Sequence, residues 1–199
     1  MIQVGLLTIS DRGAAGEYED RSGPLMAKLL AAETDWNVGA RAIIPDDQET
    51  IARALMEWSD QGLNLILTSG GTGFAPRDVT PEATRQVIER EAPGIAEALR
   101  SESLKITRHA MLSRAVAGMR GRTLIINLPG SPKAVNESLD ILLPILPHAL
   151  ELLGEDPHSE SDHRSIRIVD SYPLFVIRNC RIVAAKSFSR PGVASSSRL

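Results

Sequence analysis

The sequence predicts an α/β protein in which helices cover a mostly parallel sheet. Short apolar runs alternate with segments of helical periodicity as far as Leu153, which is the pattern of repeated βα units. The hydrophobic fraction is 43% but aromatic residues make up only 4%, so Ile, Leu, Val and Ala must fill the core. A chain of 199 residues is long enough for one sizeable domain and an appendage.

The first two βα units occupy residues 2–59. Residues 2–9 form a nearly continuous apolar run, typical of a central buried strand, and Pro24 then opens a helix after a polar loop. Residues 38–44 predict a second strand, which a helix over residues 48–59 follows. The apolar positions recur at helical spacing in both helices: Leu25, Met26, Leu29 and Leu30 in the first, and Ile51, Leu55 and Trp58 in the second.

The third unit contains the loop Thr68-Ser69-Gly70-Gly71-Thr72-Gly73. The apolar run of residues 63–67 predicts a buried strand before it. After it, Thr80 is expected to cap a helix that Pro81 opens and that extends to about Arg90. Three glycines at such a turn can take positive φ and direct backbone N–H groups toward an anion. The loop is therefore a candidate phosphate cradle, although a tight strand-to-helix connection would use the same residues.

The fourth unit reaches its strand only after two helical segments, which are expected over residues 95–104 and 110–119. The strand covers residues 123–127, and a helix then begins at Pro132 with Ser131 as its cap. Strands that alternate with helices in this way predict a parallel sheet with right-handed crossovers.

The composition changes at Gly154, so the predicted main domain comprises residues 1–153. Residues 154–165 are polar and charged without periodicity, which predicts a linker or exposed loop. Residues 166–199 form a C-terminal extension with two strand-like stretches, consistent with a hairpin, and an end expected to be disordered.

Charge and cysteine content exclude several classes of partner and location. The formal net charge of −3 and the lack of a basic run argue against nucleic acid as a partner. The one cysteine, Cys180, cannot form an internal disulfide, and no basic region precedes the apolar run near the N-terminus. Residues 141–153 are interrupted by prolines and too short to cross a bilayer. We therefore expect a cytoplasmic protein that does not contact a membrane.

Each predicted strand ends in small, polar or acidic residues. Because the carboxyl ends of parallel strands meet at one edge of a sheet, these residues are expected to converge on one crevice. The four strand ends are Ser10-Asp11, Asp46-Asp47, Ser69 to Gly73, and Pro129 to Ser131. Asp47 directly precedes a helix and is better explained as its cap.

The acids Asp46 and Asp78 are the candidate catalytic and metal-binding residues. Two carboxylates beside a polyphosphate would repel it unless a cation lay between them, and Mg²⁺ commonly uses one or two carboxylates together with phosphate oxygens. A magnesium-dependent nucleotide site follows as a hypothesis, with general acid or base catalysis by one acid as the alternative. Arginines and a lysine that flank the loops are candidates for phosphate contacts, or else solvated: Arg12, Arg77, Arg114 and Lys133.

Other common nucleotide and metal motifs are missing from the sequence. Neither a GxGxxG after the first strand nor a GxxxxGK[ST] occurs, which disfavours a dinucleotide-binding Rossmann site and a P-loop. The histidines show no zinc spacing with cysteine and are expected to be structural or solvated: His109, His148, His158 and His163.

Five segments of the chain together resemble one family. They are Thr8-Ile9-Ser10-Asp11-Arg12, Pro45-Asp46, the run SGGTGFAPRDVTPEAT from Ser69 to Thr84, Leu112-Ser113-Arg114, and Leu128-Pro129-Gly130-Ser131. These segments are similar to the molybdopterin adenylyltransferases of molybdenum cofactor biosynthesis, the MogA/MoaB family, and to the G domain of gephyrin. The resemblance covers residues 1–153, and the central run is the most specific part.

The resemblance implies a three-layer α/β sandwich that assembles as a homotrimer. It implies a reaction of molybdopterin with ATP and Mg²⁺ that gives adenylyl-molybdopterin and pyrophosphate, with Asp46 and Asp78 as the essential acids. A downstream molybdenum-insertion protein is a further expected partner. The residues expected to bind the pterin, the nucleotide or their phosphates are Ser10, Asp11, Arg12, Ser69, Gly70, Gly71, Thr72, Gly73, Arg77, Ser113, Arg114, Pro129, Gly130 and Ser131.

Two alternatives to the enzyme remain at this point. The same fold can bind molybdopterin without turnover, or it can act as a scaffold domain, as in gephyrin. The presence of both Asp46 and Asp78 favours the enzyme.

Overall fold

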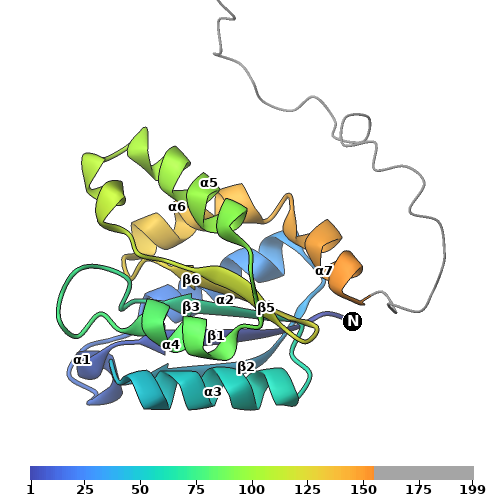
Figure 1. The fold of residues 1–199 in the computed structure, drawn as a ribbon, viewed down its shortest axis with the longest axis horizontal. Coiled ribbons are helices and arrows are strands. Elements are labelled where there is room, and N and C mark those ends of the chain that lie inside the picture. Colours follow the sequence, from blue (N-terminus) through green and yellow to red (C-terminus); the bar gives the residue numbers. More distant parts are fainter. Residues whose placement is uncertain (155–199) are drawn as a thin grey trace, which may run out of the picture. The chain divides into compact units, whose positions relative to one another are not determined.

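A six-stranded sheet with the order β2-β1-β3-β6-β5-β4 forms the centre of the protein in the computed structural model, which describes residues 1–154 (Figure 1). Strands β2, β1, β3 and β6 are parallel, whereas at the other edge β5 pairs antiparallel with both β6 and β4. In the order of the sheet the strands are β2 (Asn37–Ile44), β1 (Gln3–Ile9), β3 (Leu65–Ser69), β6 (Thr123–Leu128), β5 (Ala117–Arg120) and β4 (Arg90–Glu91).

Helices cover both faces of the sheet and produce the expected three-layer sandwich (Figure 1). One face carries α2 (Ser22–Glu33), α5 (Pro93–Leu104), α6 (Pro132–Leu142) and α7 (Leu146–Gly154). The other face carries α3 (Gln48–Asp60) and α4 (Thr80–Val87). Two short elements, α1 (Asp11–Ala14) and the 3-10 helix η1 (Arg108–Leu112), lie in the connections.

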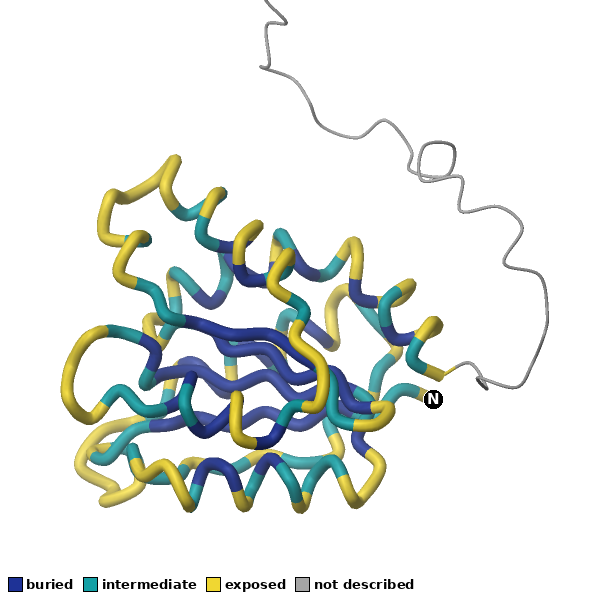
Figure 2. Tube along the Cα trace, viewed as in Figure 1, coloured by how far each residue is buried: buried dark blue, intermediate teal, exposed yellow. Residues whose placement is uncertain are grey.

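The hydrophobic core follows from this layering. All residues of β3 and β6 are buried because helices cover them on both sides, which explains their continuous apolar sequences (Figure 2). Strand β2 lies at the edge of the sheet, and its residues alternate between exposed and partly buried. Leu67 packs in the cluster beneath α2 and α6, whereas Ile66 packs beneath α3 and α4.

The antiparallel edge of the sheet corrects two expectations. The helix expected to extend to about Arg90 ends at Val87, because Ile88 is extended and Glu89 donates its N–H to Met119 O at 2.8 Å. The helix expected over residues 110–119 is replaced by the end of η1 and by β5. Pairing between β4, β5 and β6 here overrides a local pattern that suited a helix.

Two helix starts also differ from expectation. Helix α2 begins at Ser22, two residues before Pro24, because the Asp20 carboxylate accepts hydrogen bonds from the N–H groups of Ser22 and Gly23. Thr80 is the first residue of α4 and not its cap, which is Val79. No helix within residues 1–154 is long and apolar enough to cross a membrane. The expected linker and C-terminal extension lie outside the described residues.

Candidate functional site

The carboxyl ends of β1, β2, β3 and β6 meet at one edge of the sheet, as the sequence predicted. Ser69 of β3 is in register with Thr8 of β1 and with Leu128 of β6, so the loops after these strands start side by side. Hydrogen bonds join the loops directly: Gly70 N–H donates to Leu128 O at 3.2 Å, and the Ser69 hydroxyl donates to Pro129 O at 3.0 Å.

The loop after β3 has a backbone that only glycine adopts without strain at two positions. Gly70 has a φ of 107° and Gly71 a φ of 62°. A Cβ at Gly70 would lie 2.2 Å from Ile9 O, and one at Gly71 would lie 2.3 Å from Thr80 Oγ1. The buried Thr80 hydroxyl donates to Gly70 O at 3.0 Å, so it fastens the loop to the start of α4.

Asp11 and Asp46 form a reciprocal pair across two strand ends. Asp11 N–H donates to Asp46 Oδ2 at 2.9 Å, and Asp46 N–H donates to Asp11 Oδ1 at 3.0 Å. Arg77 reaches the same place from the loop before α4 and donates to both Asp11 oxygens, at 3.0 and 2.7 Å. This hydrogen bonding lowers the pKa of Asp11 and raises the pKa of Arg77, which favours the charged form of each.

The pKa of Asp46 is shifted in the opposite direction to that of Asp11. Burial raises the pKa of the Asp46 carboxyl, and the negative charges of Asp11 and Asp78 add to this effect, while the Asp11 N–H opposes it. Its Oδ1 lies only 3.0 Å from where a Cβ of Gly71 would be, so this oxygen faces the glycine loop. Asp47 instead caps α3 by accepting from Thr50 N–H at 2.9 Å, as expected.

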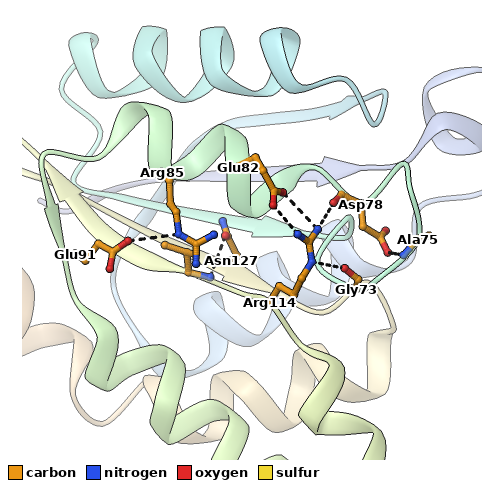
Figure 3. Close-up of polar contacts among 9 residues, drawn as sticks. Gly73, Ala75, Asp78, Glu82, Arg85, Glu91, Arg114 and Asn127 are labelled. Carbon is orange, nitrogen blue, oxygen red and sulfur yellow. Dashed lines mark hydrogen bonds and ion pairs between the residues drawn. The ribbon is translucent and has the colours of Figure 1, made fainter.

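Asp78 lies at the end of the exposed loop 74–77 and against the last glycine of the cradle (Figure 3). Its Oδ2 accepts from Ala75 N–H at 2.8 Å and would lie 2.8 Å from a Cβ at Gly73. Gly73 does not have a positive φ, and the carboxylate that packs against it explains why a glycine occupies this position. The carboxylates of Asp46 and Asp78 thus face the same loop, at Gly71 and Gly73.

The expected single crevice is not one cavity: two cavities adjoin the glycine loop, and a third is lined by Asp78 and Arg114. The first has a volume of about 310 Å³ and is lined by Ser10, Arg12, Ser69, Gly130 and Ser131 from the predicted set. Among the lining residues that sequence reasoning missed, four precede or begin α2: Tyr18, Asp20, Arg21 and Ser22. Of these four, only Asp20 left a local signal, since an acid two residues before Ser22, the first residue of α2, is typical of the start of a helix.

Polar contacts organise this first cavity. The Arg12 guanidinium lies 5.4 Å from the centre of the Tyr18 ring, which is within cation–π range. Asp20 accepts from the Thr8 hydroxyl at 2.9 Å, and the Ser22 hydroxyl donates to Gly130 O at 2.9 Å. Hydroxyl and guanidinium groups therefore line the first cavity, together with residues at the carboxyl ends of β1 and β3.

The second cavity has a volume of about 270 Å³ and lies between the glycine loop, α5, η1 and α6. Thr72, Gly73, Ser113 and Pro129 line it from the predicted set, and Leu99 and Leu112 give it an apolar wall. Lys133 is on the surface of α6, where its ammonium group lies 3.8 Å from Glu137. His109, which lines the second cavity, contacts the Thr107 hydroxyl at 3.2 Å.

Asp46 and Asp78 are the two carboxylates that face the glycine loop and could bind a metal ion at this edge. Within residues 1–154 no group of three or more acidic, histidine or cysteine side chains is placed to bind a metal. Two carboxylates are still enough for Mg²⁺, because Mg²⁺ often takes most of its ligands from substrate phosphates and water.

A glycine loop at the carboxyl edge of a parallel sheet, with two carboxylates against it, places this chain among the α/β domains that bind ligands at their strand ends. Residues 5–148 match the family described as the probable molybdopterin binding domain, and the chain belongs to this family. The match confirms the resemblance noted in the sequence.

Two similar proteins cover most of the described chain. The molybdopterin adenylyltransferase of Haemophilus influenzae is 46% identical over 142 residues, which cover 70% of this chain and 72% of that protein. The crystal structure of the molybdopterin biosynthesis enzyme MoaB from Thermus thermophilus is 52% identical, with a TM-score of 0.74. The alignment with it covers 79% of this chain and 99% of that one.

A third relative is much larger. The molybdenum cofactor synthesis protein cinnamon of Drosophila melanogaster is 48% identical over 157 residues, which cover 78% of this chain but only 26% of that protein. The chain therefore spans about a quarter of the length of this relative.

Proposed function

We propose that this protein is a molybdopterin adenylyltransferase, which transfers AMP from ATP to the terminal phosphate of molybdopterin. In this reaction a phosphate oxygen of molybdopterin bonds to the α-phosphorus of ATP. The bond from that phosphorus to the bridging oxygen breaks, and pyrophosphate leaves with the electron pair. The membership of the molybdopterin-binding family supports the proposal, as does the 46% identity to a relative that carries this name.

The observation that carries the proposal is that both carboxylates face one glycine loop. Asp46 Oδ1 faces Gly71 and Asp78 Oδ2 faces Gly73, at the edge where four parallel strands end. We assign the N–H groups of residues 71–73 to the phosphate oxygens, since the glycines keep side chains out of the approach. Preorganised donors of this kind stabilise the charge that develops at phosphorus.

The two cavities suit a reaction with two substrates. Both adjoin the loop, one through Ser69 and the other through Thr72 and Gly73, so ligands in the two cavities would meet at the cradle. We propose that the loop Pro129 to Ser131, which contributes to both cavities, orients the second substrate. Phosphoryl and nucleotidyl transfer depend mainly on such positioning.

Asp46 and Asp78 are the residues that would hold Mg²⁺ with ATP. Burial raises the pKa of Asp46, and the negative charge of Asp78 raises it further because the two carboxylates repel one another. A bound cation would relieve this repulsion. When bound, Mg²⁺ supplies neutralisation of the phosphate charge. Arg77 donates two hydrogen bonds to Asp11. It therefore holds the Asp11–Asp46 pair in place and adds a positive charge beside it.

We also propose that the protein works as a homotrimer and passes its product to a molybdenum-insertion protein. Both proposals rest on the resemblance to the family. Light scattering of the purified protein tests the first, and a trimer is expected. Co-purification with a molybdenum-insertion protein tests the second.

The experiment that tests the activity is to incubate the purified protein with molybdopterin, ATP and Mg²⁺ and to measure pyrophosphate. Stoichiometric release of pyrophosphate that depends on molybdopterin is the expected result. Asp78→Asn should reduce it about 100-fold or more, whereas the matched variant Asp47→Asn, at an acid that only caps α3, should leave it near normal. Binding of molybdopterin without pyrophosphate would instead support a non-catalytic or scaffold member of the family.

A further inference from the structure

Arg114 follows η1 and makes an unusual set of contacts with the loop that carries Asp78 (Figure 3). Its Nε donates to Gly73 O at 2.7 Å, its Nη2 donates to Asp78 O, and its Nη1 donates to Glu82 Oε1 at 2.5 Å. The backbone N–H of Arg114 also donates to Thr72 O at 2.9 Å. All three guanidinium nitrogens are thus directed at acceptors within the protein.

The two carbonyl acceptors are the two ends of one loop. Between Gly73 and Asp78 the chain passes through residues 74–77, which are all exposed, and Phe74 at its start is 66% exposed. One guanidinium group therefore joins both ends of this loop. Arg77 holds the loop at another point through its two bonds to Asp11. The Asp78 carboxylate accepts its hydrogen bond from Ala75, which lies in the same exposed loop, so the bond from Arg114 to Asp78 O is the link that ties the backbone of Asp78 to a segment outside the loop.

Glu82 fixes the orientation of the guanidinium group. Its two oxygens accept from Nη1 at 2.5 Å and from Nη2 at 3.4 Å, and it lies in the first turn of α4. A planar group held on one edge by a carboxylate has a defined direction for its other N–H groups. Lysine could not reproduce this, because an ammonium group cannot reach acceptors on three sides in a fixed plane.

We propose that Arg114 is a positioning residue, which sets the place of the Asp78 carboxylate against the glycine loop and does not bind substrate phosphate itself. The proposal rests on the function proposed above, in which Asp78 takes part in adenylyl transfer. It departs from the expectation that Arg114 contacts a phosphate, because its guanidinium group is occupied by Gly73, Asp78 and Glu82.

The first test compares steady-state kinetics of Arg114→Ala and Arg114→Lys with Arg85→Ala as the matched control. Arg85 is an arginine of α4 itself, and it pairs at 3.5 Å with Glu91, away from the loop (Figure 3). Because displacements near 1 Å can reduce turnover about 100-fold, kcat should fall by roughly that factor in both Arg114 variants. KM for ATP and for molybdopterin should change less than about threefold, and Arg85→Ala should be near normal.

A contact with phosphate would give a different pattern. KM would rise strongly with a smaller change in kcat, and Lys would restore much of the function because it keeps the charge. That result would overturn the positioning role. If Arg114→Ala does not fold, Glu82→Gln serves instead, since it leaves Arg114 in place but weakens the group that orients it; kcat should again fall with little change in KM.

A double-mutant cycle shows whether Arg114 acts through Asp78. In the background of Asp78→Asn, Arg114→Ala should reduce the remaining turnover by less than about twofold, because residues that act as a unit are not additive. Equal effects of Arg114→Ala in the wild-type and Asp78→Asn backgrounds would mean that Arg114 acts by another route.

Hydrogen exchange provides a measurement that does not require activity. The N–H groups of Ala75 and Asp78 bond within the loop. Both amides should exchange at least about tenfold faster in Arg114→Ala than in the wild-type protein, and their exchange rates should be unchanged in Arg85→Ala. If the wild-type protein releases no pyrophosphate but this exchange effect is present, the proposed function fails while the anchoring of the loop stands. Unchanged exchange at both amides would refute the proposal directly.

Discussion

Gly71→Ala is expected to destabilise the protein by about 2 kcal/mol and to impair the proposed reaction. An alanine at a φ of 62° costs about 1 kcal/mol in backbone strain. Its Cβ would lie 2.3 Å from Thr80 Oγ1, so the buried hydroxyl must turn away from Gly70 O, and losing that hydrogen bond costs about 1 kcal/mol more. For a chain of this size, the sum corresponds to a decrease in Tm of about 4–8 °C.

Gly121→Ala is the matched control for the stability of Gly71→Ala. Gly121 has a φ of 53°, and nothing lies within 4 Å of the position that a Cβ would take there, so this variant carries the backbone strain alone. Thermal unfolding should therefore give a decrease of about 2–4 °C for this variant. The difference between the two variants measures the clash with Thr80. Equal decreases would refute the reasoning about packing in the loop.

The functional part of the prediction concerns the approach to the loop. The new methyl group would also lie 3.0 Å from Asp46 Oδ1, where it crowds both the carboxylate and an incoming phosphate. Turnover should decrease on the order of tenfold or more, with weaker binding of ATP or molybdopterin. The fold should persist, since the loss is smaller than the stability of a typical domain. Normal binding of both substrates would mean that the loop is only a turn.

Three further predictions concern charge and domain limits. Asp78→Asn should reduce adenylyl transfer about 100-fold or more while molybdopterin binding persists, as measured by turnover and by calorimetry; near-normal turnover would rule out the assigned role. Asp46→Asn, measured without divalent cations, should raise Tm at pH 7, because burial raises the pKa of Asp46 and its ionised form opposes folding. That gain should shrink as the pH falls through the raised pKa towards the ordinary value of 3.8, and a gain independent of pH would contradict this cause. A protein truncated after Gly154 should unfold cooperatively, because both hydrophobic clusters are built from residues 2–153; a molten product in circular dichroism would contradict it.

The parallel part of the fold could be predicted from sequence because its signals are local. The strands β1, β3 and β6 are buried on both faces and therefore consist of continuous apolar runs. Ser131 and Asp47 precede helices and cap them as expected. The antiparallel edge gave no such signal, since β4 is two exposed charged residues, Arg90 and Glu91, and its strand state comes from pairing with β5.

The site was predictable to the level of its loops but not of its contacts. The parallel order of the strands was enough to bring Ser10, Asp46 and Gly70 to one edge. The partners of Arg114 lie 32 to 41 residues away in the sequence, so no local pattern indicated them. For the same reason the sequence predicts Thr80 as a helix cap, whereas its hydroxyl donates to Gly70 O, ten residues earlier.

The balance of charge supports the positioning role that we propose for the arginines. Asp11, Asp46 and Asp78 bring three negative charges to the strand ends, and Arg77 neutralises one of them through its two bonds to Asp11. Glu82 offsets the charge of Arg114, and each of the three guanidinium nitrogens donates to an acceptor within the protein. A polyphosphate would therefore meet a surplus of negative charge, unless backbone N–H groups and a cation between Asp46 and Asp78 compensated for it. On the proposed assignment, the arginines serve mainly to hold these two acids where that cation would bind.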